Sequence, residues 1–134
     1  SLTTSYAKHS GERAYAMARL GPGDVDVAYV YDCFTPVVLI ELEDAGFCKK
    51  GEGGPFLESH DLTYAGDFPL NTNGGMLSFG QPGLGGGMTL VVEGARQVMG
   101  RAGARQVKRN DVAFVHGNGG TFTEECSVIF GKYR

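Results

Sequence analysis

The sequence lacks both an excess of basic residues and any long apolar run. Twelve Lys and Arg stand against 15 Asp and Glu, a net charge of −3, so the basic surface that binds a nucleic-acid backbone is missing. No window approaches the roughly 18 consecutive apolar residues of a membrane span, and the polar start Ser1–Thr4 does not have the pattern of a secretory signal. We therefore expect no nucleic acid and no membrane among its partners.

Cysteine is also scarce. The three cysteines are odd in number and widely spaced, which favours reduced thiols over a disulfide framework and so predicts a cytoplasmic protein. Neither the cysteines nor the three histidines form a pair at the spacing of zinc ligands, so we expect no metal site. The residues concerned are Cys33, Cys48, Cys126, His9, His60 and His116.

Glycine, by contrast, is abundant. The 134 residues, 42% hydrophobic and 20% charged, suit one globular domain, but 22 of them are glycine. Most of the glycines fall in three clusters, at 51–54, 74–87 and 117–120. Such clusters either build a site from backbone or simply form loops, and glycine alone favours loops.

The first half of the chain predicts two helices around a strand. Residues 11–20 are rich in helix formers, and residues 25–31 form a continuous apolar and aromatic run, which predicts a strand covered on both faces and lying inside the sheet. A helix over 37–45 follows, with Pro36 at its start and Gly46 at its end.

The second half predicts a long helix and two closing strands. Apolar residues recur at helical spacing over 88–100, and 111–115 and 127–130 have the composition of strands. We expect a glycine turn containing His116 and Asn118 between these strands. Strands alternating with helices predict an α/β layer structure.

Two further expectations concern the middle and the start of the chain. The segment 51–73 shows no helical period and predicts irregular chain, with short extended pieces at 56–57 and 68–70. The chain opens on a helix, and the strand over 25–31 has no earlier strand to follow, so we expect it to begin inside a larger fold.

Polar residues follow the predicted strands. Ligands of α/β sheets bind outside the carboxyl ends of the strands, so we expect a site where Tyr31–Cys33, Asn71–Gln81 and His116–Gly120 meet. The glycines at 83–87 precede a helix but lack the Lys-Ser/Thr ending of a nucleotide-binding loop. A nucleotide loop is therefore rejected.

Four motifs carry a resemblance to a known family. Tyr31–Phe34, Asn71–Gly75, Gly80–Gly83 and His116–Gly120 resemble, in order and spacing, the C-terminal part of thiolases, above all the sterol-carrier-protein type and the related lipid-transfer-protein aldolases. The resemblance covers about residues 11–132. It implies a domain over 1–134 with helices layered on a mixed sheet, lacking the N-terminal half that holds the nucleophilic cysteine of thiolases.

The sequence departs from the family at two catalytic positions. Thiolases of this type have histidine where Tyr31 and Gln81 stand, and the aldolases have tyrosine in the Tyr31 motif. Gln81 can donate a hydrogen bond to a thioester oxygen but cannot act as a base. Tyr31, with an ordinary pKa of about 10, suits proton exchange with an alkoxide, which favours retro-aldol cleavage.

The resemblance implies catalytic roles for four residues, Tyr31, Cys33, Gln81 and His116. The backbone N–H groups of Gly119 and Gly120 would suit an oxyanion hole. Simpler roles stay open for several of these positions. Tyr31 could be a packed tyrosine, Cys33 a small buried residue and His116 a histidine of the core or of a turn. Asp32 we interpret as a cap of the helix that begins near Thr35. Gly119 and Gly120 could form only a tight turn.

The function that follows is the making or cleavage of a C–C bond in an acyl-CoA, either acetyl-CoA acetyltransferase-like or by retro-aldol cleavage. A non-catalytic module that binds acyl-CoA or a partner is the alternative. We expect no bound cofactor, a coenzyme A thioester as substrate, the N-terminal thiolase half as partner, homo-oligomers and an OB-fold, acyl-CoA-associated partner protein. The isolated chain should be inactive.

Overall fold

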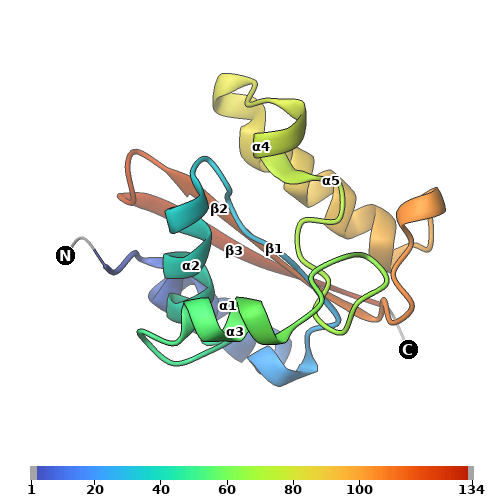
Figure 1. The fold of residues 1–134 in the computed structure, drawn as a ribbon, viewed down its shortest axis with the longest axis horizontal. Helices are drawn as coiled ribbons and strands as arrows, with labels where there is room; N and C mark the ends of the chain where they lie inside the picture. The colour runs from blue at the N-terminus through green and yellow to red at the C-terminus, as the bar shows by residue number, and fades with distance from the viewer. Residues whose placement is uncertain (1–2, 133–134) are drawn as a thin grey trace.

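A three-stranded mixed sheet forms the centre of the protein. A computed structural model describes residues 3–132. The strands are β1 (Val27–Tyr29), β2 (Val112–Gly119) and β3 (Glu124–Gly131), in that order across the sheet (Figure 1). β1 runs parallel to β2, with Ala28 opposite Phe114, and β2 runs antiparallel to β3. The mixed α/β architecture predicted from the sequence is confirmed.

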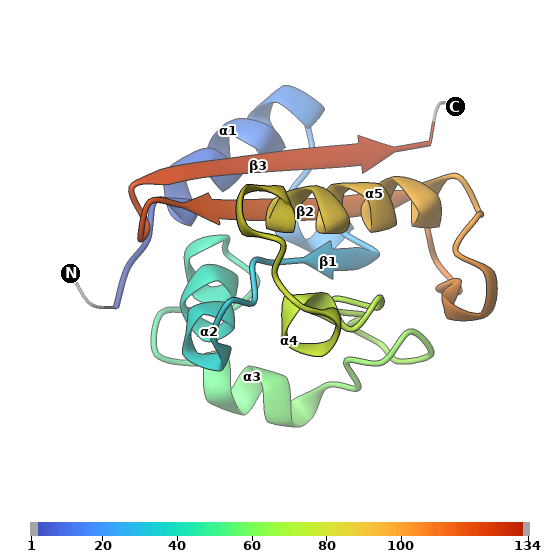
Figure 2. The ribbon, with the colours of Figure 1, turned by 90° about the horizontal axis from the view of Figure 1, so that it is seen from above.

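Helices cover both faces of this sheet. Figure 2 shows α5 (Gly86–Val98) lying along β2 on one face and α1 (Ala7–Ala18) on the other, while α2, α3 and α4 gather beyond β1. The long helices owe their positions to apolar faces that pack on the strands. The helices are α1 (Ala7–Ala18), α2 (Thr35–Asp44), α3 (Gly53–Ser59), α4 (Gly75–Phe79) and α5 (Gly86–Val98), with single 3₁₀ turns at Pro22–Asp24, Gly83–Gly85 and Gly103–Arg105.

The alternation of side chains along the strands divides the core in two. Tyr29 and Val115 point to one face and pack with Leu90 of α5. Phe114, one residue earlier than Val115, points to the other face and stacks on Tyr15 of α1 at a ring-centroid distance of 5.4 Å. The two-residue period of a strand thus supplies a separate hydrophobic core to each helical layer.

The helices over 37–45 and 88–100 are confirmed as α2 and α5. Pro36 occupies the first turn of α2, and Gly46 follows its end with φ of 85°, the left-handed conformation that glycine adopts without strain. The helix predicted from residue 11 is longer than expected, because α1 already begins at Ala7.

The prediction that residues 25–31 form the interior strand was wrong in part. β2 is the central strand, and beyond β1 the described residues supply one isolated bridge, from Ala28 to Leu70. The three residues of β1 are nonetheless no more than 1% exposed, because helices cover both faces. A continuous apolar run reports burial of the faces and not hydrogen bonding along both edges.

Three local predictions also need correction. His116 and Asn118 lie within β2, and the turn falls later, at 120–123, because the glycines of this segment pair with β3. Phe56 and Leu57 are helical, in α3, rather than extended. α4 was not predicted either, since helices of seven and five residues are too short to show an apolar period.

Candidate functional site

A cavity of about 630 Å³ opens at the carboxyl ends of β1 and β2. Tyr31 reaches it from just beyond β1, Gln81 from the segment between α4 and α5, and Asn118, Gly119 and Gly120 from the end of β2. Because parallel strands end at the same edge of a sheet, residues about 90 positions apart in the chain line one space. The three segments that the sequence predicted to form a site, 31–33, 71–81 and 116–120, therefore each contribute to this cavity.

Tyr31 and Gln81 are in direct contact within this cavity. Nε2 of Gln81 donates a hydrogen bond to the Tyr31 hydroxyl at 2.8 Å. The Tyr31 ring is 9% exposed, and burial, followed by the nearby Cys33 and Glu41, raises the pKa of its phenol. Gly86 leaves room for this hydroxyl, since a Cβ there would lie 3.1 Å from it. The phenol is thus held at the cavity with a donor directed at its oxygen.

Cys33 and His116 are not among the residues that line the cavity. Cys33 is half-buried and packs against the core cluster that contains Tyr31, and burial raises the pKa of its thiol. His116 is fully buried, with Nδ1 2.9 Å from the Ser127 hydroxyl, and burial lowers its pKa to about 4. At neutral pH these two residues are therefore a thiol and a neutral imidazole.

Asp32 caps a helix, but not the one that the sequence suggested. Its Oδ1 accepts a hydrogen bond from the backbone N–H of Met76 at 3.0 Å, and its Oδ2 from that of Leu77 at 3.3 Å. Both amides belong to the first turn of α4, whereas α2 begins without a side-chain cap. A Cβ on Gly75 would overlap this carboxylate, so glycine is required where Asp32 joins the Tyr31 segment to α4.

Glu41 is a site residue that the sequence analysis missed. It is 0% exposed on α2, its Oε2 accepts the backbone N–H of Tyr31 at 2.8 Å, and burial raises its pKa to about 9. A signal was available in the sequence. Glu41 interrupts the apolar run from Val37 to Leu42 at helical spacing from Val37, which places an acidic side chain on the buried face of the helix.

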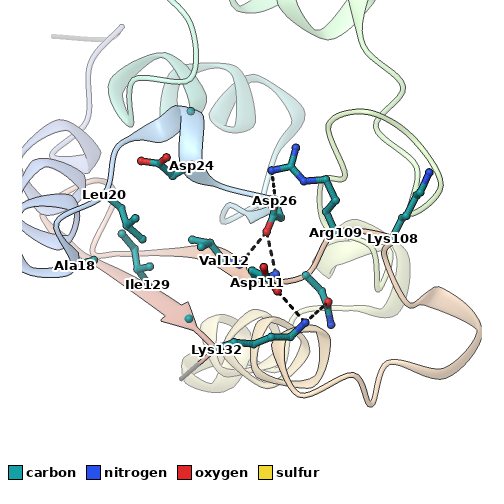
Figure 3. Close-up of a pocket in the computed structure, with 13 residues that line it drawn as sticks. Ala18, Leu20, Asp24, Asp26, Lys108, Arg109, Asp111, Val112, Ile129 and Lys132 are labelled. Carbon is teal, nitrogen blue, oxygen red and sulfur yellow. Dashed lines mark hydrogen bonds and ion pairs between the residues drawn. The ribbon is translucent and has the colours of Figure 1, made fainter. Parts of the chain in front are cut away.

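A larger cavity, of about 1010 Å³, lies at the opposite end of the sheet, where β1 and β2 begin. Figure 3 shows its charged side chains directed at one another: Arg109 pairs with Asp26 at 2.9 Å, and Lys132 with Asp111 at 3.0 Å. Asp26 also accepts the backbone N–H of Val112. None of the predicted site residues lines this cavity. Its ion pairs link the segments that precede β1 and β2 and the residue that follows β3.

Within residues 3–132, no three His, Cys, Asp or Glu side chains gather in a way that would hold a metal ion. The same residues form no helix with the length and apolar character needed to cross a membrane.

Comparison with known proteins identifies the family. Residues 1–132 match the family described as thiolase C-terminal domain-like. The chain belongs to this family. Thiolase-superfamily membership, predicted from the four motifs, is thereby confirmed.

Similar proteins carry out different reactions. The chain is 38% identical to an acetyl-CoA acetyltransferase of Methanothermobacter thermautotrophicus over 92% of its own length and 32% of that protein. It is 42% identical to a 17-hydroxy-3-oxo-4-pregnene-20-carboxyl-CoA lyase of Mycobacterium tuberculosis over 67% of its length and 22% of that protein. A solved structure, the Ltp2-ChsH2(DUF35) aldolase, matches 98% of the chain and 33% of its counterpart, with a TM-score of 0.84 and 33% identity.

The chain thus spans about a third or less of the length of the proteins that it matches. Among these relatives are both an acyltransferase and C–C-cleaving enzymes, so family membership alone leaves the reaction open. The choice between them must come from the residues that line the cavity.

Proposed function

We propose that this thiolase-like domain supplies one wall of the active site, with its proton-transferring residue, to an enzyme that cleaves a C–C bond in a β-hydroxyacyl-CoA. The observation that carries the proposal is the hydrogen bond from Gln81 to the Tyr31 hydroxyl inside the cavity. A glutamine holds no titratable proton, so Tyr31 is the member of this pair that can exchange one with a substrate.

The chemistry of retro-aldol cleavage suits a phenol at this place. A phenolate takes the proton of the β-hydroxyl group, the Cα–Cβ bond breaks, and its electron pair passes into the thioester as an enolate. The same proton then returns to the α-carbon, so a carbonyl compound and a shorter acyl-CoA are formed. The N–H of Gln81 favours the phenolate, because a donor directed at a charged oxygen stabilises it, whereas burial opposes it.

The enolate oxygen needs hydrogen-bond donors. We assign this role to the backbone amides of Gly119 and Gly120, which line the same cavity, and to the second N–H of the Gln81 amide. Neither Cys33 nor His116 lines the cavity. A catalytic role for either residue would therefore require a change in structure, or residues from outside this chain that extend the site. The acetyltransferase-like reaction, which calls for a base of neutral pKa, is less well served by a tyrosine and a glutamine.

We further propose that the domain 1–134 works together with the N-terminal half of a thiolase and in homo-oligomers, with a coenzyme A thioester as substrate and no bound cofactor. The similar solved structure is an Ltp2-ChsH2(DUF35) aldolase, and its two-part name supports a second protein as partner. We propose that this partner is of the OB-fold, acyl-CoA-associated type that the family resemblance implies. Co-purification with the full-length protein tests this partner, and full activity of the thiolase-like chain alone would remove the need for it.

The test of the reaction is an assay of the full-length protein with β-hydroxyacyl-CoA and β-ketoacyl-CoA substrates. Cleavage of the hydroxy substrate in preference to thiolysis of the keto substrate is the expected result. Preference for the keto substrate would support the acetyltransferase-like reaction. Turnover of neither would leave the non-catalytic module as the better description.

A further inference from the structure

Glu41 lies between the two walls of the cavity. Its Oε2 accepts the backbone N–H of Tyr31 at 2.8 Å, and its Oε1 accepts the side-chain amide of Asn118 at 3.3 Å. Tyr31 belongs to the wall beyond β1, and Asn118 to the wall at the end of β2. A single fully buried carboxyl group therefore connects both strand ends.

The connection continues into the turn at 120–123. Oδ1 of Asn118 accepts the backbone N–H of Phe122 at 3.2 Å, past Gly119 at the end of β2 and Gly120 at the start of this turn. Thr121 and Phe122 have φ of 57° and 67°, a left-handed conformation that is strained for non-glycine residues and persists only where neighbouring contacts enforce it. The bond from Phe122 to Asn118 is one such contact.

Other groups also face Glu41. Nε2 of His116, from β2, lies 3.9 Å from its Oε1, and Oε2 of Glu125, from β3, lies 3.5 Å from the same His116 nitrogen. Asp32, beside Tyr31, adds a like charge. Burying an acidic group among these neighbours is costly, and its two accepted hydrogen bonds offset part of that cost.

We infer that Glu41 is a positioning residue, which fixes the position of Tyr31 relative to Gly119 and Gly120 across the cavity. The inference rests on the proposed function of Tyr31 and adds to it the group that sets its place. Glu41 does not line the cavity and does not touch the substrate space itself.

A count of donors and acceptors provides a specific test. Three N–H groups, those of Tyr31, Asn118 and Phe122, depend on the two oxygens of Glu41 and the one oxygen of Asn118. Glu41→Gln removes one acceptor, so one of these three donors loses its partner however the two amides are turned. Adding Asn118→Asp restores the count, because the new carboxylate accepts both from Gln at position 41 and from Phe122.

The experiment compares these variants in the full-length protein. Glu41→Gln should lower kcat on the β-hydroxyacyl-CoA by about 10- to 100-fold while KM changes less than about twofold, since misplacement of reacting groups affects the chemical step. The double variant Glu41→Gln/Asn118→Asp should recover kcat to within about threefold of wild type. The matched control is Glu43→Gln on the same helix, because Glu43 also accepts a backbone N–H, that of Gly53, but lies away from the cavity.

A coupling measurement separates positioning from a general structural role. If Glu41 acts through Tyr31, adding Glu41→Gln to Tyr31→Phe should cost much less than it does in the wild-type background. Full additivity, an unchanged kcat in Glu41→Gln, or a folded double variant without recovered activity would each overturn the inference. If Glu41→Gln does not fold, the double variant should still fold and turn over substrate. A double variant that fails to do so would refute the pairing of Glu41 with Asn118.

Amide hydrogen exchange provides a readout that needs no turnover. Exchange at Tyr31 or over residues 119–122, where β2 ends and the turn begins, should be faster in Glu41→Gln and return to the wild-type rate in the double variant. If wild-type protein cleaves no acyl-CoA, the proposed function fails, yet these exchange rates still decide whether Glu41 holds the two walls together. Unchanged exchange in Glu41→Gln contradicts the inference in either case.

Discussion

Gln81 donates its side-chain N–H to the hydroxyl of Tyr31 across 50 residues of sequence. The bond holds the phenol oxygen at the cavity, where it accepts the amide N–H. Burial raises the pKa of Tyr31, so a donor at its oxygen is the means by which this site can favour the phenolate.

Replacement of Gln81 by Met tests this donor. Met has a similar length but no N–H, so the phenolate should lose stabilisation and kcat should fall roughly tenfold, the worth of a hydrogen bond to a charged group. The rise of kcat with pH should also move to higher pH. The measurement is kcat against pH for the wild-type and Gln81→Met full-length proteins. The same pH dependence in both would mean that Gln81 does not influence the reacting group.

Gly75→Ala should destabilise the domain by about 2–4 kcal/mol, because a residue with a Cβ is strained at φ of 64° and its Cβ would overlap the Asp32 carboxylate. Urea unfolding measures the loss. Gly54→Ala is the matched control, since that Cβ would meet nothing within 4 Å. Equal stability of the two variants would contradict the role assigned to Asp32.

The unfolding free energy should fall as pH rises from about 6.5 to 8.5. Burial raises the pKa of Glu41 to about 9, so its contribution is complete below its unfolded value of 4.5 and is lost as pH rises toward 9. Burial lowers the pKa of His116 to about 4, so its contribution is complete above 6.5 and is lost as pH falls. Above pH 6.5, of these two groups only Glu41 makes the unfolding free energy depend on pH. The unfolding free energy should fall by at most about 1.4 kcal/mol per pH unit.

Glu41→Gln isolates this effect, because a glutamine at position 41 does not titrate. Denaturant unfolding of wild type and variant at several pH values gives the comparison. The slope of the unfolding free energy against pH should differ between them by nearly 1.4 kcal/mol per pH unit over this range, which corresponds to about one proton. Parallel curves would show that Glu41 is ionised in the folded protein at neutral pH.

The isolated chain should self-associate. Five large apolar side chains of the α4–α5 region are about half exposed or more, and exposed apolar side chains that lie together commonly mark an interaction surface. They are Leu77, Phe79, Leu84, Met88 and Val92. Light scattering should find oligomers, and Leu84→Glu should reduce them; a strictly monomeric chain at high concentration would argue against a covering partner on this face.

Much of the fold and of the site was predictable from the sequence. The long apolar period of α5 and the apolar run of β1 specify their structure locally, and the rule that sites form at the carboxyl ends of strands placed Tyr31, Gln81 and Gly119 together.

The remaining features depend on tertiary contacts. α4 is too short for any periodicity, and it is held by Asp32, 44 residues away from Met76 in the sequence. The role of Glu41 depends on Asn118, 77 residues later, and no local pattern reports such a pair. The depth of His116 follows from its place inside β2, which the glycines around it obscured by suggesting a turn.

The most direct test of the proposed reaction is the turnover of Tyr31→Phe in the full-length protein on a β-hydroxyacyl-CoA. The variant keeps the buried ring and removes only the hydroxyl, so kcat should fall by about 10² to 10⁴-fold with little change in KM. Tyr15→Phe, which removes a buried hydroxyl far from the cavity, should retain wild-type turnover. Wild-type turnover in Tyr31→Phe would contradict the account and make Tyr31 a packed tyrosine only.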